Sequence, residues 1–266
     1  MNLSQPAPRF VVALAQALRF YSRLPIPRLP EEALPASALD FQAIAPAVPG
    51  AGALIGLVMA LILLVAHGLR LEPLVAAIFA VATGVVVTGA LHEDGLADMA
   101  DGFFVEAGRE RRLGIMRDSR LGTFGGLALI IVMLLRVALI AALAFEGPRA
   151  AATALIAAAA LSRAAGLMPL ALLMPARSDG AGATAGRLPI PAFTNAVLIG
   201  CGIAFVFGLI GGFGVLRALG ACVAALVAAR GVCTLAERKI GGQTGDVAGA
   251  TQIVVELACY LVLATG

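Results

Sequence analysis

Seven long apolar stretches constrain this chain more than any other feature of its sequence. They run over Ala45–His67, Leu74–Leu91, Phe124–Phe145, Ala150–Met174, Asn195–Phe213, Val215–Leu235 and Val247–Thr265. A helix that crosses a bilayer needs roughly 20 mostly apolar residues, so each stretch is long enough to span. Hydrophobic residues make up 61% of the chain and charged residues 13%, whereas soluble domains average roughly half and a quarter. We therefore expect an all-α, polytopic membrane helix bundle of about seven transmembrane helices, with residues 1–266 forming a single integral-membrane domain.

The segment before the first apolar stretch is of a different kind. Residues 9–26 read RFVVALAQALRFYSRLPI, in which Arg9, Arg19 and Arg23 interrupt the apolar residues. This mixture is typical of an amphipathic helix that lies in the membrane interface, and the prolines that follow would end it. Because the residues before it are few and polar, we expect no cleavable signal peptide.

Charged residues are distributed unevenly between the two ends of such a bundle. With seven spans, one side receives the N-terminus and the loops at 92–123, 175–194 and 236–246. When Arg230 and Arg217, near the two ends of one span, are included, fourteen of the 19 Lys and Arg residues fall on this side and three on the other, so the positive-inside rule makes it cytoplasmic. Every Asp residue falls there too. Because acidic residues have little influence on orientation, their gathering indicates a polar site on that face.

Two other features argue against nucleic-acid binding and against a functional role for the cysteines. The net charge of +3 is small and scattered, which does not favour nucleic acid as a partner. The cysteines lie in or beside apolar stretches without CxxC spacing, at positions 201, 222, 233 and 259. They are expected to be small buried apolar residues.

The segment HEDGLADMADG, residues 92–102, holds three of the Asp residues. In a helix, Asp94, Asp98 and Asp101 lie at i, i+4 and i+7 and therefore share one face. Carboxylates this close repel one another, so a cation is expected to neutralise them, and a set of oxygen ligands fits Mg²⁺ or Mn²⁺ rather than zinc. The alternative is a solvated acidic face. His92 points away from the Asp residues and is not expected to bind the metal.

The segment RDSRLGTFGG, residues 117–126, predicts a phosphate site. Arg117 and Arg120 flank Asp118 and Ser119, and glycines follow where an apolar stretch begins. Arginine binds phosphate oxygens through two hydrogen bonds, and a glycine-rich helix start exposes amide donors to anions. The alternative is a positive-inside anchor followed by a helix cap.

Two shorter segments on the same side complete the polar set. They are ARSDGAG at 176–182 and GGQTGD at 241–246. The first is expected to form a turn that pairs Arg177 with Asp179, either as an ordinary polar turn or as a substrate contact. The second can form an anion-binding nest of backbone amides, with helix capping by Thr244 and Asp246 as the alternative.

Three ionisable residues, Arg136, Arg163 and Glu256, lie inside apolar stretches at similar depths. An isolated charge in a bilayer costs at least a few kcal/mol. We therefore predict that Glu256 pairs with Arg163 or Arg136 as a structural bridge.

In this order, FYSRLPIP at 20–27, HEDGLADMADG, RDSRLGTFGG, ARSDGAG and GGQTGD closely resemble the cobalamin synthase (adenosylcobinamide-GDP ribazoletransferase) family, over nearly the whole chain. One residue departs from the family's pattern. Glu93 stands where an apolar residue is expected, and it is expected either to perturb the metal site or to face solvent.

The resemblance implies a Mg²⁺-dependent phosphoryl transfer late in cobalamin biosynthesis, at the cytoplasmic face of the bacterial inner membrane. Adenosylcobinamide-GDP and α-ribazole, or α-ribazole 5′-phosphate, would give adenosylcobalamin, or its 5′-phosphate, and GMP. The candidate metal ligands are Asp94, Asp98, Asp101 and Asp246. Asp118 is the first candidate for the general base and Asp98 the second. The candidate substrate-binding residues are Arg117, Ser119, Arg120, Arg177, Asp179, Gln243 and Thr244.

Two alternatives belong to other classes. A lipid-headgroup CDP-alcohol phosphotransferase would use similar chemistry on CDP-diacylglycerol. An ion-coupled membrane transporter would need ionisable groups near the bilayer midplane and repeated halves, whereas the Asp residues lie at one interface and we find no internal repeat. Membrane lipid is a certain neighbour in each case, and the sequence leaves the oligomeric state open, including a homo-oligomer.

Overall fold

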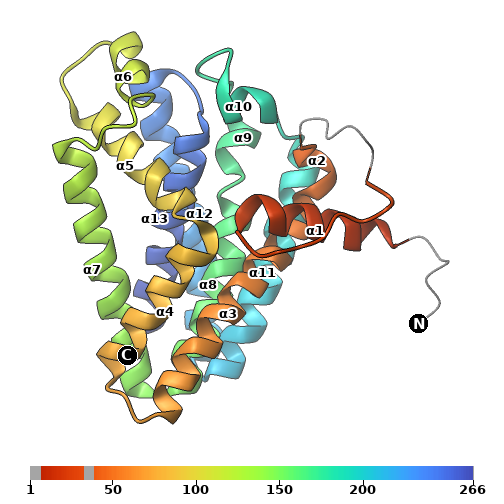
Figure 1. Ribbon diagram of the computed structural model, residues 1–266, viewed down its shortest axis with the longest axis vertical. Coiled ribbons are helices and arrows are strands. Elements are labelled where there is room, and N and C mark those ends of the chain that lie inside the picture. The colour runs from red at the N-terminus through yellow and green to blue at the C-terminus, as the bar shows by residue number, and fades with distance from the viewer. Residues whose placement is uncertain (1–6, 33–38, 266) are drawn as a thin grey trace.

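The computed structural model describes residues 7–32 and 39–265, and most of that part is helical (Figure 1). The elements are α1 (Arg9–Tyr21), α2 (Phe41–Ile44), η1 (Ala45–Ala47), α3 (Val48–Gly68), α4 (Pro73–Thr88), α5 (Leu91–Phe104), α6 (Arg109–Ile115), α7 (Thr123–Glu146), α8 (Pro148–Ala165), α9 (Met168–Leu172), α10 (Gly180–Ala185), α11 (Ile190–Gly211), α12 (Gly214–Ile240) and α13 (Gly245–Ala264). Within these residues the only strand-like pairing is an isolated parallel bridge between Pro175 and Gln243. The all-α prediction is confirmed.

The predicted spans are also confirmed. Six helical runs among the described residues are long and apolar enough to cross a membrane, and α4 with α5 would add a seventh crossing. The runs are Phe41–Gly68, Thr123–Glu146, Pro148–Leu172, Ile190–Gly211, Gly214–Ile240 and Gly245–Ala264. The amphipathic segment before them forms α1, which ends at Tyr21.

Helix α8 forms the centre of the bundle, because 94% of the most apolar 18 residues in the run Pro148–Leu172 are buried. Its sequence is rich in alanine, which allows neighbouring backbones to approach closely. On α3, a Cβ atom added at Gly56 would lie 2.6 Å from the carbonyl oxygen of Leu155. Helices α3 and α11 therefore pack on α8 through small residues.

A sharp bend separates α4 from α5, whose axes differ by 87°. The two linking residues, Gly89 and Ala90, have φ angles of 65° and 57°, in the left-handed region that favours glycine. The amide of Arg23 donates to the carbonyl of Val87 (2.6 Å) next to the bend. The sequence predicted one apolar span up to Leu91. That boundary is wrong, because the helix ends at Thr88 and the chain turns before the acidic segment begins.

The polar loops gather at one end of the bundle. Figure 1 shows α2, α6, α10 and the start of α13 at its upper end, and the turns between α3 and α4 and between α7 and α8 at its lower end. This arrangement is the one that seven crossings predict. Which end faces the cytoplasm stays a prediction.

Candidate active site

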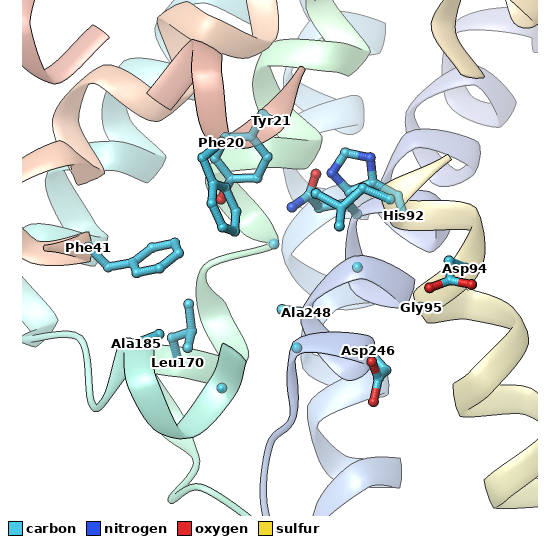
Figure 2. Close-up of a pocket in the computed structure, with 16 residues that line it drawn as sticks. Phe20, Tyr21, Phe41, His92, Asp94, Gly95, Leu170, Ala185, Asp246 and Ala248 are labelled. Carbon is cyan, nitrogen blue, oxygen red and sulfur yellow. The ribbon is translucent and has the colours of Figure 1, made fainter. Parts of the chain in front are cut away.

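The acidic segment is helical, and it packs against the start of α13. A Cβ atom added at Gly95 would lie 3.0 Å from the carbonyl oxygen of Asp246, so the absence of a side chain at Gly95 lets the two backbones approach. Asp94 and Asp246 line one pocket (Figure 2), and the negative charges of both act on Asp98. Asp94, Asp98 and Asp246 are thus close enough to repel one another, and the charge of Asp101 also acts on Asp98.

The fourth predicted ligand, Asp101, has a structural partner. Its two carboxylate oxygens accept hydrogen bonds from the amides of Gly122 and Gly125, both at 2.8 Å. A side chain at either glycine would collide with this carboxylate. The glycine-rich helix start was predicted to offer its amides to an anion. In the structure two of those amides bind Asp101, which caps α7 from the side.

The arginines of the site are paired differently from the prediction. Arg177 forms an ion pair with Asp246 (3.6 Å) and Arg117 forms one with Asp179. The predicted pairing of Arg177 with Asp179 is therefore wrong, because the loop folds back onto the start of α13. Nη1 of Arg177 is buried and has no hydrogen-bond partner among the described residues. This leaves one donor for an anionic ligand next to the carboxylates.

Asp118 and Arg120 bind each other at the protein surface, with 2.6 Å between Nη2 and the carboxylate. Hydrogen bonds from Arg120 lower the pKa of Asp118, which weakens it as a base. Ser119 between them is exposed. These three residues lie on the loop before α7 and do not line the pocket that holds Asp94 and Asp246.

The GGQTGD loop is tied to the segment that follows α9. The amide of Gln243 donates to the carbonyl of Met174, and the amide of Ala176 donates to the carbonyl of Gln243, both at 2.8 Å. Thr244 caps α13 by accepting from the amide of Val247 (3.3 Å), so the capping alternative holds for Thr244. Its hydroxyl also contacts Asp246 (3.1 Å) and so orients one of the candidate ligands.

The donor chemistry fits Mg²⁺. Asp94, Asp98 and Asp246 offer only oxygen atoms, and Arg177 offsets part of their charge. Among the described residues no three His, Cys, Asp or Glu side chains are arranged to enclose a metal ion. Mg²⁺ bound to a phosphate substrate commonly has one or two carboxylate ligands together with the phosphates, a number that these Asp residues could supply. The ligand assignments stay predictions.

An apolar cavity of about 140 Å³ adjoins these carboxylates. Its wall includes Phe20 and Tyr21 from α1, Phe41 from α2, His92 from α5 and Gln252 from α13. We call it the aromatic pocket. Figure 2 shows Phe20, Tyr21 and Phe41 on one side of this pocket, and His92, Asp94 and Asp246 on the other.

A model of the cobalamin-5-phosphate synthase family matches residues 13–264. The chain belongs to this family. It is similar to proteins named adenosylcobinamide-GDP ribazoletransferase. One from Azorhizobium caulinodans is 52% identical over 94% of both chains, and one from Xanthobacter autotrophicus is 47% identical over 95% of this chain and 96% of that protein. A third, from Rhizobium etli, is 43% identical over 96% of this chain and 97% of that protein. No solved structure matches the chain.

Glu93 is the residue that departs from the family's sequence pattern, and its place differs from both expectations. It is 5% exposed and pairs with Arg136 (2.6 Å). It therefore neither faces solvent nor joins the carboxylates around Asp98. Arg136 also pairs with Glu256 (2.9 Å).

Glu256 has a second ion pair, with Arg163 at 3.4 Å, and accepts from the hydroxyl of Tyr260 (3.1 Å). The predicted pairing of Glu256 is confirmed with both arginines. We call Glu93, Arg136, Arg163 and Glu256 the interior ion network.

Three residues of the site were missed by the sequence. Tyr21 lies in the FYSRLPIP segment, to which no role was assigned, and Gln252 lies in a stretch that carries no motif. His92 was set aside because it does not share a face with the Asp residues. For His92 a signal existed, since it opens the HEDGLADMADG motif. For Tyr21 and Gln252 only the tertiary structure brings them to the pocket.

Proposed function

We propose that this chain is a Mg²⁺-dependent adenosylcobinamide-GDP ribazoletransferase, which joins adenosylcobinamide-GDP to α-ribazole or its 5′-phosphate and releases GMP. One observation carries the proposal. The charges of Asp94, Asp246 and Arg177 all act on Asp98, and Arg177 pairs with Asp246, in a chain whose relatives bear that name. A site of this charge suits a diphosphate that is bound together with a cation.

The reaction is a displacement at phosphorus. A ribose hydroxyl of α-ribazole attacks the phosphorus nearest the cobinamide, and a new P–O bond forms. The bond from that phosphorus to the bridging oxygen breaks, and its electrons leave with GMP. The proton of the hydroxyl passes to a carboxylate.

Asp94 and Asp246 are our candidates for holding Mg²⁺, with Asp98 beside them. When bound, the ion neutralises charge on the diphosphate oxygens. Arg177 supports this assignment because its buried Nη1 has no partner and can donate to the same phosphate. Arg117 can join it if its surface ion pair with Asp179 opens, since exposed pairs contribute little free energy.

For the general base we prefer Asp98 to Asp118. Asp118 is held by Arg120, which lowers its pKa. Asp98 is half-buried and surrounded by like charges, so accepting a proton relieves repulsion. We place the reaction at the cytoplasmic face of the inner membrane, on the basis of the arginine distribution.

The test uses the full-length chain purified in detergent. Adenosylcobinamide-GDP, α-ribazole and Mg²⁺ are expected to yield adenosylcobalamin and GMP in equal amounts, and omission of either substrate should abolish both. Exchange of the cobinamide nucleotide for CDP-diacylglycerol should give no product. Failure to form the corrinoid product, or release of CMP in the second reaction, would contradict the proposal. Turnover in detergent also excludes dependence on an ion gradient.

A further inference from the structure

The aromatic pocket has two buried polar atoms that nothing in the described structure satisfies. They are Nε2 of His92 and Oε1 of Gln252, on side chains of residues that are only 3% and 4% exposed. A buried polar atom without a partner costs free energy, and such atoms are rare in native structures. A ligand with matching groups would remove this cost.

The shape of the pocket suits a flat aromatic ring. The ring of His92 stacks on that of Tyr21 with centroids 6.0 Å apart and planes 13° apart. Phe20 contacts Tyr21 and Phe41 edge to face. A volume of about 140 Å³ is close to that of a cavity, roughly 150 Å³, that holds the single ring of benzene, so a two-ring base would extend toward the exposed lining residues Phe20 and Leu91. A corrin macrocycle is far too large for this space.

We propose that the aromatic pocket binds the base of the acceptor, α-ribazole, and that His92 and Gln252 recognise it. This inference rests on the proposed function and assigns one of its substrates to a place. The 5,6-dimethylbenzimidazole base has two methyl groups that suit the apolar wall and one free ring nitrogen. Nε2 of His92 can donate to that nitrogen. Oε1 of Gln252 can accept from a hydroxyl of the attached ribose.

The position of the carboxylates agrees with this placement. Asp94 and Asp246 line the same pocket, so a ribose attached to a base in the pocket lies next to the residues that we propose for phosphoryl transfer. The guanine base of the donor fits less well. It has several donors and acceptors on its edges, and most of them would face apolar side chains without a partner.

The first experiment measures kcat and KM for both substrates. Gln252→Met and His92→Phe keep much of the shape and remove the polar atom. Each is expected to raise KM for α-ribazole about tenfold and to leave KM for adenosylcobinamide-GDP unchanged. Gln252→Glu keeps Oε1 and should restore part of the affinity. The matched controls are His67→Phe, at the far end of α3, and Gln42→Met on α2, neither of which lines the pocket.

The second experiment needs neither turnover nor the buried variants. Equilibrium dialysis measures binding of free 5,6-dimethylbenzimidazole to the full-length chain in detergent. Ala185→Leu places a larger side chain into the pocket from the short helix α10, where Ala185 is half-exposed. It should abolish binding, whereas Ala183→Leu on the same helix, outside the pocket, should preserve it.

The outcomes separate the two proposals. If the wild-type chain forms no corrinoid product, the proposed function fails, and the dialysis still decides whether the pocket takes the base. If product forms but the variants raise KM for adenosylcobinamide-GDP, the pocket holds guanine or another part of the donor and the inference is overturned. Equal loss of kcat with both KM values unchanged, or binding that survives Ala185→Leu, overturns it as well.

Discussion

Two neighbouring residues on α5, Glu93 and Asp94, enter two very different charged regions. Glu93 belongs to the interior ion network, where two glutamates meet two arginines and all four residues are at most 5% exposed. Asp94 belongs to a cluster with Asp98 and Asp246, in which Arg177 pairs with Asp246 and its charge acts on Asp98. The charges of the interior ion network balance one another, whereas the cluster around Asp98 keeps an excess of negative charge.

The difference shows how charge balance separates a structural role from a functional one. A buried charge must be paired inside the protein, since no other partner can reach it. A half-exposed cluster with excess charge can instead be completed by a ligand, here a cation with a diphosphate. Changes in the first region should therefore reduce stability, and changes in the second should reduce activity.

The largest effect is expected in the interior ion network. Arg136→Met leaves Glu93 and Glu256 buried with only Arg163 between them, and it should lower the free energy of unfolding by about 3–5 kcal/mol. Thermal unfolding of the purified protein in detergent measures this, with the exposed Arg230→Met as the control. An unfolding midpoint equal to that of the control would show that the network does not stabilise the fold.

The matched change on the other side of α5 should act on turnover. Asp94→Asn removes a proposed Mg²⁺ ligand and should reduce turnover about 100-fold, the upper range seen when support of a metal site is lost, with little change in thermal unfolding. Glu93→Gln should show the opposite pattern, with reduced stability and a smaller effect on turnover per folded molecule. Near-normal turnover of Asp94→Asn at saturating Mg²⁺ would refute the ligand assignment.

Magnesium itself offers a test that does not depend on substrate. An ion that binds only the folded state stabilises it, by about 2.7 kcal/mol at a hundredfold excess over its Kd. The unfolding midpoint of the wild type should rise with Mg²⁺ and return with a chelator, and Asp246→Asn should remove the shift. The shift should persist in Arg136→Lys, because the interior ion network lies apart from the ion. If Mg²⁺ raises the unfolding midpoint of Asp246→Asn as much as that of the wild type, metal binding does not distinguish the cluster around Asp98 from the interior ion network.

The smallest effect is expected at Asp118. Because its ion pair with Arg120 is exposed, and such pairs contribute little, Asp118→Asn should change turnover less than about threefold. Asp98→Asn, measured in parallel by corrinoid product formation, should lose far more. A larger loss in Asp118→Asn than in Asp98→Asn would restore Asp118 as the base.

Sequence patterns predicted the parts of this molecule that depend on length and periodicity. A bilayer demands helices of a given length, so the apolar stretches identified the spans, and the helical repeat placed Asp94 and Asp98 on one face. The depth of Arg136, Arg163 and Glu256 predicted that they meet.

Pairings between loops could not be predicted, because they depend on which segments fold together. Arg177 and Asp179 are neighbours in sequence, yet each binds a residue from another segment. The bend at Ala90 was also missed, since a left-handed alanine carries no sequence signal. The same holds for the aromatic pocket, whose residues come from α1, α2, α5, α10 and α13.

The bend between α4 and α5 makes chain length in this segment critical. One residue inserted between Gly89 and Leu91 would lengthen a link of only two residues, both in the left-handed region, and would change the direction in which α5 leaves the bend. Glu93 would then leave the arginines, and Asp94 would leave the start of α13. A single insertion here should therefore damage folding and catalysis together. By contrast, the loop at 105–108 joins α5 to the short helix α6 beyond both charged regions, and a change of length there would leave the orientation of α5 intact.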